Sequence, residues 1–168
     1  MTPTLRLVTN FVLFQSSWWA AFFFQNNAVP VMLALAAIMF WMSQVRKIDL
    51  YLCATVVIAC ALEIAANQLG LMSFSTPLLP LWLCILWLCL LLTINQSLRF
   101  INSLSFWQCF ALCWVAAPFS YLGAAKFGVL TINYPWWQFY LIYGAMWAAT
   151  FSVIVMINRR MLNVLNTD

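Results

Sequence analysis

The stretch VVIACALEIAANQLG, residues 56–70, decides the class of fold, because it reads as a membrane helix interrupted by one charged residue. Glu63 lies among apolar residues, and Asn67 follows one helical turn later on the same face. On insertion scales an acidic side chain at the centre of a membrane helix costs about 2.5 to 3.5 kcal/mol. We therefore expect this face to point into a helical bundle or a wet cavity instead of into lipid.

The composition of the whole chain agrees with a bilayer as its solvent. Of the 168 residues, 67% are hydrophobic and only 6% are charged, whereas soluble domains carry about 25% charged residues. The formal net charge is +4, but the cations are spread along the chain. Because no basic stripe could follow a phosphate backbone, the sequence argues against nucleic-acid binding.

Groups that could carry acid–base or metal chemistry are scarce. The chain has no histidine, and its only carboxylates are those of Asp49, Glu63 and Asp168. Histidine is the commonest acid–base group at neutral pH and the commonest metal ligand. The six cysteines lie in apolar stretches without a C-x-x-C pair, which is typical of packing residues. We expect no metal and no cofactor, and the sequence does not favour an enzyme made from this chain alone.

Six apolar stretches approach the roughly 20 residues that a membrane helix needs. Backbone groups find no water in the bilayer core, so each stretch should be helical. We predict an all-α integral membrane protein, residues 1–168 forming one compact bundle of about six transmembrane helices. The approximate spans are 7–24, 28–42, 50–69, 79–100, 106–129 and 136–157.

The distribution of cations predicts the orientation of these spans. Cytoplasmic loops carry an excess of lysine and arginine. With six spans one side receives only Lys126, and the prediction is that both termini are cytoplasmic. The opposite, cytoplasmic side receives Arg6, Arg46, Lys47, Arg99, Arg159 and Arg160.

Within the last span, Gly144 and Ala148 are four residues apart, a spacing of small residues that lets helices approach closely.

A first polar group is expected around Glu63. Lys126 lies late in the fifth span, after Pro118, which should bend that helix. We hypothesise that Glu63 pairs with Lys126, directly or through Tyr121 or water. The alternative for Lys126 is that its side chain extends to the lipid headgroups.

A second polar group is expected in TINQSLRF, residues 93–100, where Asn95 and Arg99 are spaced four apart on the predicted fourth span. Amides inside lipid seek partners on other helices, and an interhelical network would draw on further amides. Such a network either lines a ligand pocket or only fixes helix register, and Arg99 alone could be an interfacial anchor. The further amides are those of Asn10, Gln15 and Gln108, and the candidate ligand-binding residues are Glu63, Asn67, Asn95, Gln96, Arg99, Tyr121 and Lys126.

Two stretches, PLWLCILWLCLLLTINQSLRFI and APFSYLGAAKFGVL, resemble a known family, the small bacterial inner-membrane proteins called domain of unknown function 2878. The resemblance covers nearly the whole chain and includes the NFVLFQ opening, the PLWL start, the N-SLR turn and the P-SY-G-A-K-G stretch. Relatives often carry histidine where Gln96 stands here. The resemblance implies a multi-pass protein of the bacterial inner membrane and no established activity. It also implies membrane-lipid modification enzymes as genomic neighbours. The matching candidate positions are Asn95, Ser97, Arg99, Pro118, Tyr121, Gly123 and Lys126.

The reading that these features favour is a protein that binds or handles a lipid or another hydrophobic ligand, or that assists lipid-modifying enzymes. Its expected partners are membrane lipid, such enzymes or further copies of the chain. One alternative is a small transporter with Glu63 as its proton site. Another is a structural subunit of a membrane complex, in which the polar residues serve assembly.

Overall fold

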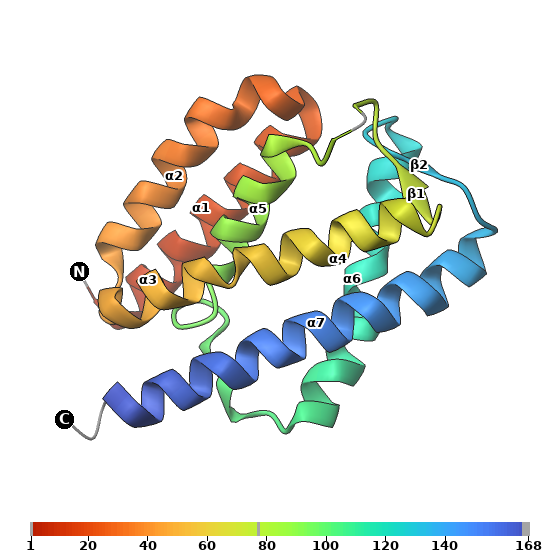
Figure 1. Cartoon of the computed structure of the whole chain (residues 1–168). Helices are drawn as coiled ribbons and strands as arrows, with labels where there is room; N and C mark the ends of the chain where they lie inside the picture. The colour runs from red at the N-terminus through yellow and green to blue at the C-terminus, as the bar shows by residue number, and fades with distance from the viewer. Residues whose placement is uncertain (1, 77, 166–168) are drawn as a thin grey trace.

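A computed structural model describes residues 2–76 and 78–165, and 79% of the chain is helical. The helices pack side by side, and both chain ends lie at one end of the molecule (Figure 1). In chain order the elements are α1 (Pro3–Phe24), the 3-10 turn η1 (Gln25–Ala28), α2 (Val29–Met42), α3 (Arg46–Ala54), α4 (Val56–Gln68), β1 (Met72–Ser73), α5 (Leu81–Leu91), η2 (Arg99–Ser103), α6 (Phe106–Lys126), β2 (Thr131–Ile132) and α7 (Trp136–Leu165).

Four helical stretches are long and apolar enough to cross a membrane, which supports a membrane protein. They are Pro3–Met42, Arg46–Gln68, Phe106–Lys126 and Trp136–Val164. The first of them turns back at η1, so α1 and α2 form a hairpin (Figure 1). Large apolar side chains cover the outside, among them Trp41, Val57 and Trp107 at 72%, 70% and 73% exposure. Such a surface suits lipid and not water.

The predicted helix over residues 79–100 is wrong in its length. α5 ends at Leu91 after 11 residues, and the chain then runs through turns to η2. Eleven residues rise only about 16 Å, roughly half of the hydrocarbon core. The helix stops where the apolar run LWLCILWLCLLL gives way to TINQS. The side chains of Asn95, Gln96 and Ser97 bond to other segments of the chain.

Two glycine turns align α4 with α6. Gly70 ends α4 at φ +70° and Gly128 ends α6 at φ +74°, a left-handed conformation that glycine adopts without cost. In each turn the next residue donates back into the helix, Leu71 to the Ala66 carbonyl and Val129 to the Ala124 carbonyl, both at 3.0 Å. The strands β1 and β2 follow directly and pair antiparallel. The ends of α4 and α6 are thereby held at the same level.

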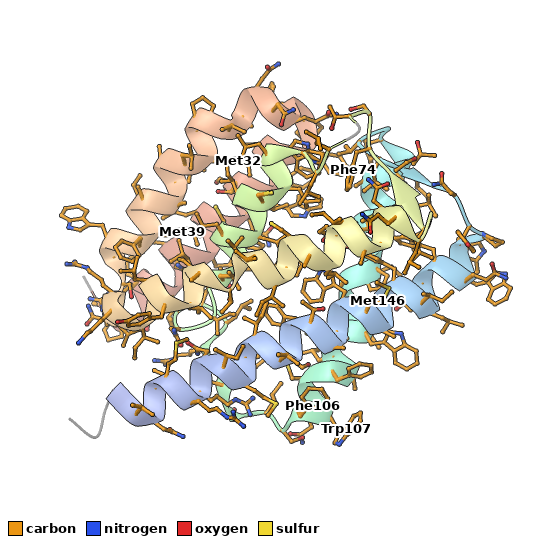
Figure 2. The ribbon with its side chains drawn as sticks, viewed as in Figure 1. Met32, Met39, Phe74, Phe106, Trp107 and Met146 are labelled. Atoms are coloured by element: carbon orange, nitrogen blue, oxygen red, sulfur yellow. The ribbon has the colours of Figure 1, made fainter. Side chains whose placement is uncertain are left out.

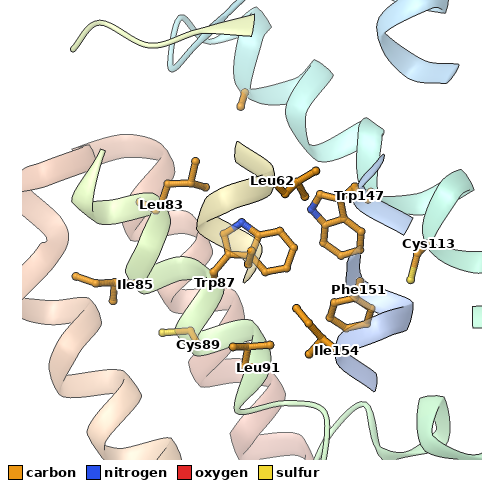
Figure 3. Close-up of a cluster of buried hydrophobic side chains, with 14 of the residues drawn as sticks. Leu62, Leu83, Ile85, Trp87, Cys89, Leu91, Cys113, Trp147, Phe151 and Ile154 are labelled. Atoms are coloured by element: carbon orange, nitrogen blue, oxygen red, sulfur yellow. The ribbon is translucent and has the colours of Figure 1, made fainter. Parts of the chain in front are cut away.

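The core lies between α2, α4, α5 and α7. Met32 and Met39 of α2 are fully buried, whereas Trp107 projects from the start of α6 (Figure 2). In the centre, the rings of Trp87 and Trp147 stack with centroids 5.0 Å apart, and Phe151 stacks on Trp147 at the same distance (Figure 3).

The helix α6 packs mainly along α7, and the expected contact face of small residues is confirmed there. A Cβ atom at Gly144 would meet the Pro118 ring and the Trp114 side chain, both at 2.8 Å. Only glycine permits this approach. Beside the proline, the Tyr140 hydroxyl donates to the Val115 carbonyl at 2.7 Å. Pro118 lies within α6, and its ring packs against Gly144 of α7.

Candidate functional site

Glu63 accepts hydrogen bonds from three aromatic side chains, each on a different helix. Its carboxyl group is completely buried. Trp87 Nε1 of α5 donates to Glu63 Oε1 at 2.8 Å, and the Tyr121 hydroxyl of α6 donates to the same oxygen at 2.6 Å. The Tyr143 hydroxyl of α7 lies 3.0 Å from both carboxyl oxygens. One carboxyl group on α4 therefore ties four helices together.

The glycine turns explain why Glu63 and Tyr121 meet. Glu63 stands seven residues before Gly70, and Tyr121 stands seven residues before Gly128. Because β1 and β2 hold the two turns at one level, both side chains lie about 10 Å below their helix ends. The third donor, Tyr143, directly precedes Gly144, where α7 packs against Pro118 and Trp114 of α6. Local chain geometry thus places three of the four groups at the same depth.

A direct ion pair between Glu63 and Lys126, one form of the hypothesis, is wrong, whereas the contact between Glu63 and Tyr121 is confirmed. Lys126 lies in the last turn of α6 and is exposed, and within residues 2–76 and 78–165 no ion pair joins it to Glu63. The residues bonded to the carboxyl group are all uncharged. Asn67, one turn after Glu63, is half-buried and is not among the groups that bond to Glu63.

Asn95 belongs to a second polar group, in which side-chain amides bond to one another. Asn158 Nδ2 of α7 donates to Asn95 Oδ1 at 2.7 Å, and Asn95 Nδ2 donates back to Asn158 Oδ1 at 2.9 Å. Asn95 Nδ2 also donates to Asp49 Oδ1 of α3 at 2.8 Å. Asn102 joins through a bond from Asn158 at 3.0 Å. We call these four residues, Asp49, Asn95, Asn102 and Asn158, the amide cluster.

The amide cluster and its neighbours satisfy the backbone of the irregular segment 92–98. Asn102 Nδ2 donates to the Ile94 carbonyl at 3.0 Å, and Asn10 Nδ2 of α1 donates to the Leu92 carbonyl at 3.3 Å. The Ser97 hydroxyl donates to Asn10 Oδ1 at 2.6 Å. Non-helical backbone at membrane depth is tolerated only when it is buried in protein or lines a cavity. These side chains supply the partners that such a segment needs.

The remaining predicted residues divide between structural and surface roles. Gln96 Nε2 donates to the Met39 carbonyl of α2 at 3.2 Å, so it joins the interhelical network as expected. Arg99 is exposed at the start of η2. Gln108 was expected in the network, but it completes a capping box with Ser105 at the start of α6. Its side chain reaches back to its own helix because an N-terminal amide lacks a helical partner.

A groove of ≈ 510 Å³ runs between α1 and α5 on one side and α6 and α7 on the other. Its walls are apolar, and its floor contains the stacked rings of Trp87 and Trp147 (Figure 3). Lining residues on α6 and before it are accessible from outside, with Leu112 at 43% and Phe100 at 52% exposure. A smaller pocket of ≈ 50 Å³ shares Tyr121 with the groove. The groove is therefore open along the apolar surface of the bundle.

Tyr121 connects the groove to the buried carboxyl group. It lines the groove and donates to Glu63 at the same time. Trp87 does the same from the floor of the groove. A molecule in the groove would therefore be separated from Glu63 by one side chain. Across the described residues no three His, Cys, Asp or Glu side chains gather to hold a metal ion. What Tyr121 provides at this place is a hydrogen bond to Glu63.

Several residues of these sites were missed from the sequence. Trp87 and Tyr143 lie in apolar helices, where tryptophan and tyrosine are read as packing or interface residues. Asp49 and Asn158 stand near predicted span ends, where polar residues need no special explanation. One signal could have indicated the Tyr121 contact, because Glu63 and Tyr121 have the same spacing to the following glycine.

Comparison with family models matches residues 7–153 of the chain to the description "Protein of unknown function (DUF2878)". The chain belongs to the DUF2878 family. The match runs from α1 into α7 and includes both the Glu63 group and the groove. The resemblance expected from the PLWL and P-SY-G-A-K-G stretches is thus confirmed. No curated protein and no solved structure matches the chain.

Proposed function

We propose that the chain is a bacterial inner-membrane protein with six membrane-embedded helical segments and cytoplasmic termini. α1 and α2 count as two of the segments, α3 with α4 as one, and the short α5 as one that ends inside the membrane. The distribution of cations supports this arrangement, because Lys126 alone lies at the end where β1 and β2 pair. Both chain ends lie at the opposite end (Figure 1).

We propose further that the protein binds a lipid or another hydrophobic ligand in the groove. The observation that supports this function is the ≈ 510 Å³ groove with apolar walls, reached from the lipid-facing side past Leu112 and Phe100. Ligand pockets in proteins measure about 300 to 1,000 Å³ and combine apolar walls with a few polar groups. Tyr121 and Ser120 are the polar groups of the α6 wall. A protein of this kind could present a lipid to a lipid-modifying enzyme.

Native mass spectrometry of the purified protein tests this function. Ala116 lines the groove and is exposed, so Ala116→Phe fills the groove without burying a larger residue in the core. Ala111 is exposed on the same helix but outside the groove, so Ala111→Phe is the matched control. We expect a bound lipid with the wild type and the control, and its loss in Ala116→Phe. Equal lipid retention by all three proteins would contradict binding in the groove.

A second candidate function is proton-coupled transport. The observation that favours it is the interruption of α5 at Leu91, because discontinuous helices near the bilayer midplane often form transport sites. Glu63, buried and bonded to Tyr121, would be the proton site. Proteoliposomes containing a pH-sensitive dye test this function, since proton uptake should disappear in Glu63→Gln. Uptake that is unchanged in the variant, or absent from the wild type, would exclude the role of Glu63.

A further inference from the structure

The groove contains no formal charge. All its lining residues are uncharged at neutral pH, and the polar ones are Gln15, Ser120, Tyr121 and the tryptophans. An ionised carboxylate or phosphate in this groove would lose its hydration without gaining a cation, which is very costly. The occupant of the groove should therefore be uncharged in the part that enters it.

The two hydroxyl groups that line the groove both donate hydrogen bonds within the protein. The Ser120 hydroxyl donates to the Ala117 carbonyl at 2.8 Å, and the Tyr121 hydroxyl donates to Glu63 at 2.6 Å. A hydroxyl group has one proton to donate and two lone pairs that accept. Ser120 and Tyr121 therefore offer a ligand acceptors only. A group that donates a proton suits this wall, whereas an ether or a ketone does not.

Hydrogen-bond donors for the ligand oxygen come from α1. Gln15 stands on α1 and lines the groove, and its amide has no bond to another group in the described parts of the chain. Trp147 does not add a donor, because its ring nitrogen is fully buried and interacts with the Tyr121 side chain. Figure 3 shows the nitrogen of Trp147 on the side that faces Trp87. Unpaired donors in an apolar setting cost free energy, which a ligand oxygen would recover.

We infer that the groove binds an uncharged lipid that carries a hydroxyl group, an inference that rests on the proposed binding function. The hydroxyl proton goes to Ser120 or Tyr121, and the hydroxyl oxygen accepts from Gln15. The apolar chain lies along the groove walls, among them Phe14, Leu83 and Leu86. A hydroxyl group is the smallest group that serves both the acceptors on α6 and the donors opposite.

Competition for tritium-labelled hexadecanol on the full-length protein in detergent tests the inference. The competitors are unlabelled hexadecanol, hexadecyl methyl ether, which accepts but cannot donate, and palmitate, which is charged. One neutral hydrogen bond corresponds to about a tenfold difference in affinity, so the ether should compete about tenfold more weakly than hexadecanol. Palmitate should compete more weakly still. An ether as good as hexadecanol, or palmitate as the best competitor, would overturn the inference.

Variants locate the hydroxyl group within the groove. Ser120→Ala and Tyr121→Phe each remove one acceptor, and at least one of them should weaken hexadecanol binding about threefold to tenfold while ether binding stays unchanged. Ser103→Ala is the matched control, because Ser103 donates to the Phe100 carbonyl three residues back, as Ser120 does to Ala117. If neither variant changes the ratio of alcohol to ether, the inference is wrong.

Failure of the inference and failure of the binding function give different results. If hexadecanol and the ether bind equally and Ala116→Phe abolishes both, the groove binds hydrophobic ligands without selecting a hydroxyl group. The binding function then stands and the inference falls. If labelled hexadecanol shows no saturable binding, or binds equally to Ala116→Phe, both fall together.

Discussion

The Tyr121 hydroxyl donates a 2.6 Å hydrogen bond to Glu63, which lies 58 residues earlier in the chain. Both residues occupy the second turn before a left-handed glycine, and the strands after these glycines pair. The bond is therefore a consequence of the alignment of α4 with α6. It also places a groove-lining hydroxyl group against the single buried carboxyl group of this region.

The first prediction concerns the coupling between Glu63 and Tyr143. Tyr143→Phe removes a donor to both carboxyl oxygens and leaves the ring, which stacks on Phe139 with centroids 4.8 Å apart. In a double-mutant cycle with Glu63→Gln, we expect the two costs in unfolding free energy to be non-additive by about 1 kcal/mol. This lies between the mean of about 0.6 kcal/mol and the maximum of about 1.7 kcal/mol found for hydrogen bonds between membrane helices. Unfolding in mixed micelles measures the cycle.

Tyr140→Phe is the control for this cycle. Tyr140 stands three residues earlier on α7 and donates to the Val115 carbonyl at 2.7 Å, and it does not bond to Glu63. The cost of Tyr140→Phe in unfolding free energy should add to the cost of Glu63→Gln within about 0.5 kcal/mol. Additivity of Tyr143→Phe, or coupling as large for Tyr140→Phe, would show that the bonds to Glu63 do not stabilise the fold.

The second prediction concerns the amide cluster. Asn158 is fully buried and exchanges two bonds with Asn95, so Asn158→Ala leaves several amide groups without partners. We expect a loss of about 2 kcal/mol in unfolding free energy, since each unsatisfied buried group costs about 1 to 3 kcal/mol. Hydrogen exchange should rise first in segment 92–98. The exposed Asn27→Ala is the control, and equal exchange in both variants would contradict a structural role for the cluster.

The third prediction concerns orientation. If β1 and β2 lie outside, Lys126→Cys should react with a membrane-impermeant maleimide added to intact cells, whereas Lys47→Cys should react only after permeabilisation. Both residues are exposed, at opposite ends of the bundle. The unsubstituted protein, whose six cysteines are buried or half-buried, gives the background. The reverse pattern of labelling would place the termini outside.

The sequence predicted the burial of Glu63 well, because insertion energies alone exclude an acidic side chain from lipid. Of the three hydrogen-bonding partners it identified only Tyr121. A lysine in the neighbouring span was the obvious choice by charge, yet Lys126 lies at the end of α6 and is exposed. Hydrogen bonds from tyrosine and tryptophan side chains stabilise the buried carboxyl group of Glu63 without a second charge. Which aromatic residues turn inward depends on helix rotation, and that depends on contacts such as the one at Gly144.

The fourth span shows the second limit of the sequence. Hydropathy and length predicted a helix over residues 79–100, but α5 ends at Leu91. A hydropathy profile contains no information on tertiary hydrogen bonds. It therefore cannot show that the side chains of Asn10, Asn102 and Asn158 bond to segment 92–98. Asn10 and Asn158 come from distant parts of the chain. Where tertiary partners for the backbone exist, a helix can stop inside the membrane.

The last prediction concerns Gly144, where α7 meets α6. A Cβ at this position would lie 2.8 Å from both the Pro118 ring and the Trp114 side chain. The tryptophan could rotate, but the proline ring is fixed in its helix, so Gly144→Ala must push the helices apart. Overpacking of this kind costs about 1 to 3 kcal/mol. We expect a loss of that size in unfolding free energy.

Gly123→Ala is the matched control for this substitution. Gly123 also lies inside a helix, but nothing stands within 4 Å of the position that its Cβ would take. Alanine is the better helix former by about 1 kcal/mol, so Gly123→Ala should leave the stability unchanged or raise it. Because Tyr143 adjoins Gly144, Gly144→Ala should also weaken the coupling between Tyr143 and Glu63. A stable Gly144→Ala protein with that coupling intact would show that the close approach of α6 and α7 does not position the Glu63 group.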